Sequence, residues 1–103
     1  AAASFANRLA KNRKALRPWA EKEGLTAYRL YDADIPEYAV AVDIYADHAH
    51  VQEYAPPKEI EPEKAEARVR DVLAVVPEVL EIPRAHVHLK TRVRSKGGSQ
   101  YGK

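Results

Sequence analysis

The sequence predicts a small α+β domain in which a helix packs on one face of an antiparallel sheet. Two stretches place apolar residues at helical spacing, residues 38–45 alternate with a period of two, and short extended runs lie between turn-forming residues. The chain has 103 residues, of which 46% are hydrophobic and 31% are charged, as is typical of one globular domain. The predicted order is helix, strand, strand, strand, helix, strand and basic tail.

The first predicted helix covers residues 5–23. Its apolar residues fall near helical spacing at Phe5, Leu9, Leu16 and Trp19. Ser4 can cap its start, Gly24 can end it, and Pro18 removes a backbone hydrogen bond, which leaves a break there open. Because the apolar stripe is thin, we expect this helix to lie outside the core.

Three strands are predicted next, over residues 25–31, 38–45 and 48–54. The first two are separated by a turn at 32–37, and the last two form a hairpin that closes near Ala46 and Asp47. The hairpin lacks the favoured Asn-Gly turn, so its turn geometry stays open.

A second helix is predicted over residues 62–76. Pro62 suits its first turn, whereas Pro77 conflicts with an unbroken helix, so we expect a separate or kinked turn from there to about residue 81. A last strand covers residues 85–93, with Val87 and Leu89 on one face and the histidines and bases on the other.

Charge is distributed unevenly along the chain. The net charge is only +2, but residues 1–22 carry +5, residues 23–83 carry −9 and residues 84–103 carry +6. Two basic ends therefore flank an acidic middle, which favours an anionic partner at the ends.

Both basic ends contain candidate RNA-binding residues. In the tail these are Lys90, Arg92, Arg94, Lys96, Gln100 and Tyr101, and in the first helix they are Arg8, Lys11, Lys14 and Arg17. Bases contact phosphates, whereas amides and aromatic rings contact nucleobases. The alternatives are an edge strand protected by charge for the tail and a solvated linker helix for the first helix.

The sequence contains no convincing catalytic, cofactor-binding or metal-binding residues. Nothing brings the pair His48 and His50 together with the pair His86 and His88, so we interpret them as surface or RNA-facing histidines. The acids around the 32–37 turn are typical of turns. The chain has no cysteine, none of its four glycines forms a G-x-G-x-x-G loop, and no serine lies in a G-x-S-x-G motif.

Five segments resemble one known family: FANRLAKN (5–12), YRLYDADIPEY (28–38), AVDIY (41–45), VQEYAPPK (51–58) and KTRVRSKGGSQY (90–101). The family is that of the bifunctional bacterial 23S rRNA methyltransferases, which fuse a guanine-N2 half to a guanine-N7 half. The segments are similar to the part that precedes the catalytic domain of the N7 half. The resemblance implies an S-adenosylmethionine-binding domain after Lys103.

This resemblance implies three parts. Residues 1–24 would be a basic linking helix, residues 25–94 a small α+β module of strand-strand-helix-strand type, and residues 95–103 a basic, glycine-containing tail leading to a catalytic domain that this chain lacks. The lack of methionine also leads us to expect a segment of a longer protein.

We therefore expect an accessory RNA-positioning module of an S-adenosylmethionine-dependent methyltransferase, which binds no cofactor itself. The alternative is a structural coupler between methyltransferase domains that never touches RNA. The expected partners are ribosomal RNA and the neighbouring domains, with a cytoplasmic location and no membrane contact. Exposed strand edges leave a dimer open.

Overall fold

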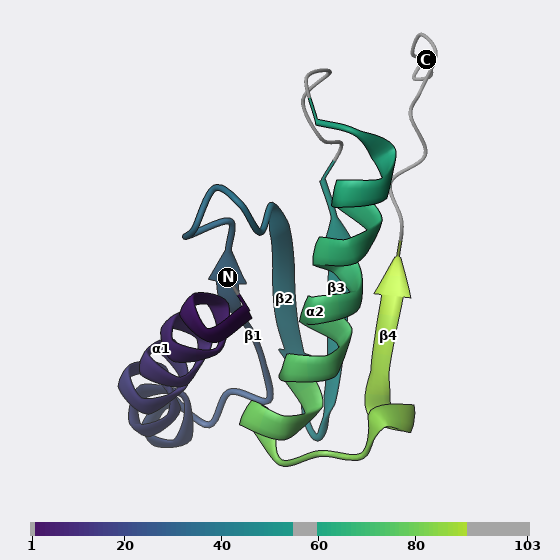
Figure 1. Cartoon of the computed structure of the whole chain (residues 1–103). Coiled ribbons are helices and arrows are strands. Elements are labelled where there is room, and N and C mark those ends of the chain that lie inside the picture. Colours follow the sequence, from purple (N-terminus) through teal and green to yellow (C-terminus); the bar gives the residue numbers. More distant parts are fainter. Residues whose placement is uncertain (1, 55–59, 91–103) are drawn as a thin grey trace, which may run out of the picture.

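A computed structural model describes residues 2–54 and 60–90 and confirms the α+β fold (Figure 1). Its elements are α1 (Ala2–Glu23), β1 (Ala27–Asp32), β2 (Val40–Tyr45), β3 (His48–Glu53), α2 (Pro62–Leu80), the 3₁₀ turn η1 (Arg84–His86) and β4 (Val87–Lys90). The four strands form one sheet in the order β1-β2-β3-β4. Both helices cover the same face of this sheet, and they also pack against each other.

The sheet is mixed, which corrects the expected antiparallel arrangement. β1, β2 and β3 pair antiparallel, and the predicted hairpin between β2 and β3 is confirmed, with Ala46 at a φ of 57° in its turn. β4, however, runs parallel to β3. The physical reason is α2, whose 19 residues rise about 28 Å and carry the chain back to the end of the sheet where β3 starts.

Neither proline breaks its helix, so the break that was left open at Pro18 does not occur and the interruption predicted at Pro77 is wrong. Pro18 lies inside α1 on its exposed side, where the carbonyl that lacks a partner can be solvated. α2 continues through Pro77 because Val76 and Leu80 are buried on either side of the proline. The predicted end of the second helix at residue 76 is therefore also wrong.

One of the two predicted ends of α1 is confirmed and the other is wrong. Gly24 ends the helix as predicted, at a φ of +69°, and the amide of Leu25 donates to the carbonyl of Ala20 at 2.8 Å. At the other end the helix already includes Ala2. Ser4 therefore lies in the first turn and is not the residue that precedes the helix.

α1 belongs to the core, which corrects the expectation that it lies outside. Phe5 and Leu9 are completely inaccessible to solvent. The Phe5 ring packs edge-on against Tyr31 at 5.0 Å between ring centroids and stacks on Tyr38 at 5.2 Å. The remaining core comes from β1 to β4 and from Val72, Val76 and Leu80 of α2. Among the described helices, none combines the length and apolar character needed to cross a bilayer.

Replacing Phe5 by Ala should destabilise the whole domain, because a buried ring is lost from a packed core. We expect a loss of about 3–5 kcal/mol in the free energy of unfolding, measured by urea denaturation. Lys11→Ala, on the exposed side of the same helix, should change it by no more than about 0.5 kcal/mol. Equal effects of the two substitutions would mean that α1 does not belong to the core.

Candidate nucleic-acid interface

Polar contacts fix α1 to the first strand and set the direction of its basic side. The pairing of β1 with β2 shifts between Arg29 and Tyr31, so Leu30 occupies an irregular position. The side-chain amide of Asn12 donates to the carbonyl of Leu30 at 3.0 Å and to the carboxylate of Asp34 at 2.9 Å. One side of α1 is therefore held by the sheet, and the opposite side faces solvent.

The four candidate bases of α1 are all exposed. Within the described part of the chain, Arg8, Lys11 and Lys14 take part in no ion pair. Arg17 differs, because its Nε donates to the carboxylate of Glu21 at 3.1 Å. Three of the four positive charges are thus available to an anionic partner, while the fourth is partly neutralised.

Two hollows border the second half of α1, and both are lined by bases and by Glu21, the first also by Asp47. One, of about 320 Å³, is lined by residues of α1, the hairpin turn and the end of α2. The other, of about 370 Å³, lies along α1 beside Val79. Arg13 and Arg17 line both hollows, and Lys14 lines the second. Bases beside concave surface are suited to a phosphate backbone.

Sequence reasoning missed Arg13. The four predicted bases lie three residues apart along the helix, and Arg13 does not fit this spacing. The signal was its place in the apolar stripe, between Leu9 and Leu16. A half-buried base at such a position lies beside the neighbouring helix and not in open solvent.

The other basic end is only partly described. Lys90 is exposed at the end of β4, the strand at the far edge of the sheet from β1 (Figure 1). Since α1 packs on β1 and α2, the described structure does not bring Lys90 together with the bases of α1. The other tail candidates, Arg92, Arg94, Lys96, Gln100 and Tyr101, lie outside the described residues.

The acids near the 32–37 turn make structural contacts. Asp34 accepts the side chain of Asn12 and also the amide of Asp32 at 3.1 Å. Asp43 accepts two hydrogen bonds from Arg29 on the neighbouring strand, at 2.6 and 3.0 Å, and these contacts raise the pKa of Arg29. These contacts agree with the structural interpretation of the acids.

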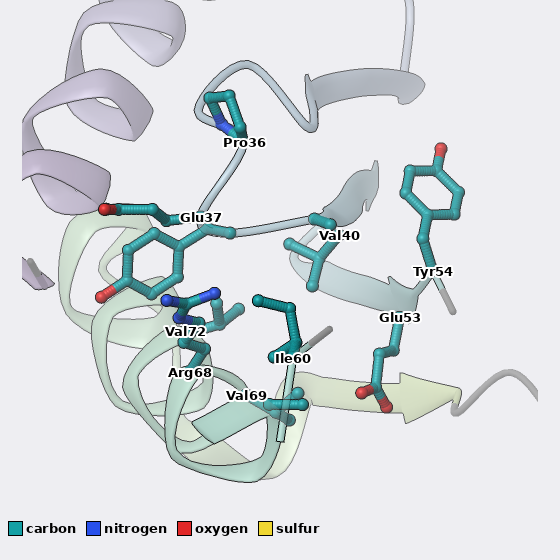
Figure 2. A pocket seen from close by; sticks show the side chains of 12 residues that line it. Pro36, Glu37, Val40, Glu53, Tyr54, Ile60, Arg68, Val69 and Val72 are labelled. Atoms are coloured by element: carbon teal, nitrogen blue, oxygen red, sulfur yellow. The ribbon is translucent and has the colours of Figure 1, made fainter. Parts of the chain in front are cut away.

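A small hollow lies between β2 and the first half of α2 (Figure 2). Its volume is about 90 Å³, and its walls include Val40, Val69 and Val72, with Glu37 and Glu53 nearby. Typical small-molecule sites measure about 300–1,000 Å³. Arg68 also lines it, and its small volume does not suit a nucleotide, so we assign no ligand to it.

The two histidine pairs lie together, contrary to the sequence-based expectation. In the parallel register His50 is opposite His88, and the ring of His48 stacks on those of His86 and His88 at 4.1 and 5.1 Å. Partial desolvation, followed by the charges of the three neighbouring imidazoles, lowers the pKa of His88. His48, with Asp47 of the hairpin turn, also lines the hollow that Arg13 and Arg17 border.

The chain is similar to a segment of bacterial methyltransferases that are named for large-subunit ribosomal RNA. The particular relatives are called ribosomal RNA large subunit methyltransferase K/L. The protein from Chromohalobacter salexigens is 54% identical over 99 residues, or 96% of this chain. Those from Stutzerimonas stutzeri and Allochromatium vinosum are 58% and 52% identical, over 94% and 97% of it.

The match covers nearly all of this chain but little of each relative. The chain spans 13–14% of the length of these curated proteins. No family model matches the chain. The relatives therefore indicate which kind of protein contains such a segment, and the role of the segment has to be argued from its own residues.

Glu21→Gln should strengthen RNA binding, because it removes the carboxylate that pairs with Arg17. We expect a two- to threefold gain in affinity at low salt, and a log–log salt slope steeper by up to about 0.7 for a single strand. Filter binding at several salt concentrations measures both quantities. Glu66→Gln removes one exposed acid from α2 and is the matched control. An equal gain in both variants would exclude a specific role of Arg17.

Proposed function

We propose that this chain is an accessory RNA-positioning module of an S-adenosylmethionine-dependent 23S rRNA guanine-N7 methyltransferase. In this role it holds RNA for a neighbouring catalytic domain and does not methylate RNA alone. The cofactor belongs to the parent enzyme, which we place in the cytoplasm. The module's partners are ribosomal RNA and the adjoining methyltransferase domains.

The observation that carries this proposal is the basic side of α1. Arg8, Lys11 and Lys14 point to solvent from a helix whose other side is buried, and Arg13 and Arg17 line the hollows beside it. Fixed bases lose less freedom on binding a phosphate backbone than bases on a mobile linker. The names of the relatives supply the substrate class, because large-subunit ribosomal RNA is the RNA to which those names refer.

A structural coupler between domains is the second candidate. It is favoured by Trp19, which is 47% exposed near the end of α1 and packs edge-on against Tyr28, and by the neighbouring exposed Leu25. Exposed aromatic residues are common anchors of protein interfaces. In this alternative the end of α1 docks on another domain and RNA is bound elsewhere.

The experiment is a salt titration of a large-subunit rRNA fragment with the double variant Lys11→Glu and Lys14→Glu. We expect at least a tenfold loss of affinity at low salt and a log–log slope reduced by about 1.4, since two phosphate contacts are lost. The control is Lys64→Glu with Arg70→Glu, which reverses two exposed bases of α2. A second variant, Lys90→Glu with Arg92→Glu and Arg94→Glu, tests the tail separately.

The outcomes separate the two candidates. If the α1 variant and its control bind RNA equally, α1 does not position RNA and the coupler is favoured. In that case Trp19→Ala should weaken docking to the adjoining domains. Micromolar binding of S-adenosylmethionine by the chain alone would contradict the proposed division of labour between module and catalytic domain.

A further inference from the structure

The fold gathers four histidines and one aspartate at one end of the sheet. His48 and His50 come from β3, His88 from β4, His86 from η1 and Asp47 from the hairpin turn. By the strand register, His48, His50 and His88 lie on the face that the helices leave uncovered, since the alternate residues Ala49, Val51 and Val87 are buried. The proposed RNA-binding role assigns no contact to these five side chains, and Asp47 and His48 line one of the hollows beside Arg13 and Arg17.

The ligand atoms of three of these side chains lie close together. The carboxylate of Asp47 lies 3.8 Å from Nε2 of His48 and 3.6 Å from Nδ1 of His86. The ligand atoms of the three residues all lie within 4.8 Å of one another. With metal–ligand bonds of about 2.1 Å, tetrahedral donors lie roughly 3.4 Å apart. Because the rings of His48 and His86 are stacked at an interplanar angle of 12°, one ring has to rotate about its side-chain bonds before all three donors reach bonding distance of one cation.

The hydrogen bonding around His48 suits metal ligation. Nδ1 of His48 lies 2.9 Å from Nε2 of His88. When Nδ1 carries the proton, it donates to His88, and the lone pair of Nε2 is left facing Asp47. Metal-binding histidines usually donate their second ring N–H in this way, which fixes the tautomer and the ring. Nδ1 of His86 donates to the carbonyl of Asp47 at 2.9 Å, so binding a cation through Nδ1 requires that this contact breaks and that the ring proton moves to Nε2.

We propose that Asp47, His48 and His86 bind a divalent first-row transition-metal cation, for which Zn²⁺ is the best match. Two imidazoles and one carboxylate are a ligand set of zinc, whereas Mg²⁺ and Ca²⁺ prefer oxygen ligands alone. All three side chains are at least partly exposed, so an ion can enter from solvent and water can complete its coordination. His88 is a positioning residue, which acts through His48.

The test is a calorimetric titration of Zn²⁺ alone into the 103-residue chain in chelator-free buffer. We expect about one ion per chain, bound with micromolar or tighter affinity. Asp47→Ala, His48→Gln and His86→Gln should each weaken binding at least about tenfold, and His88→Ala about tenfold through loss of the outer hydrogen bond. His50→Gln is the matched control and should retain the affinity within about threefold.

Two further measurements separate a loss of metal binding from a loss of folding. Circular dichroism checks that each variant is folded, and the visible absorption of bound Co²⁺ should appear in the native chain and in His50→Gln but not in His48→Gln. The absence of saturable binding would overturn the proposal. An equal loss in His50→Gln and His48→Gln would also overturn it, because the ion would then be held by scattered surface imidazoles.

Discussion

The burial of Phe5 joins α1, the sheet and α2 into one unit. Its ring contacts Tyr31 and Tyr38, and the Tyr31 hydroxyl donates to the carbonyl of Tyr38 at 2.8 Å while accepting the amide of Ile35 at 3.1 Å. The hydroxyl of Tyr38 in turn donates to Asp71 of α2 at 3.0 Å. Desolvation, assisted by this hydrogen bond, raises the pKa of Tyr38 to about 12, so the ring stays neutral at physiological pH. The position of the exposed bases of α1 relative to the sheet depends on this buried cluster.

A helix fixed in this way has a different role from a loose linker. Its bases keep a constant spacing and direction relative to the sheet, and the contact of Asn12 with the irregular position in β1 prevents rotation about the helix axis. Lys90 lies at the opposite edge of the sheet, beyond α2. RNA bound along α1 therefore meets Lys90 only if it extends across α2, and the two basic ends need separate tests. The histidine cluster is a third surface, and its members Asp47 and His48 line the same hollow as Arg13 and Arg17.

Local signals were sufficient for the fold class, the hairpin and the glycine that ends α1. Features that depend on distant residues could not be predicted. The thin stripe of α1 gave no indication that two positions, Phe5 and Leu9, would be completely buried. The parallel pairing of β4 depends on α2 continuing through Pro77, and the histidines meet across 40 positions of sequence only because of that pairing. The role of Arg13 also depends on distant residues, because its neighbours in the hollow come from α2 and the hairpin.

Hydrogen exchange of individual amides, followed by NMR under native conditions, tests most directly whether α1 is part of the folded core. The amides of Leu9 and Leu16 in α1 should exchange with the same free energy of opening as those of Val42 and Val51 in the sheet, because all four require global unfolding. A free energy lower by more than about 2 kcal/mol for α1 alone would show that the helix opens independently. In that case the basic residues of α1 would not form a fixed surface for RNA.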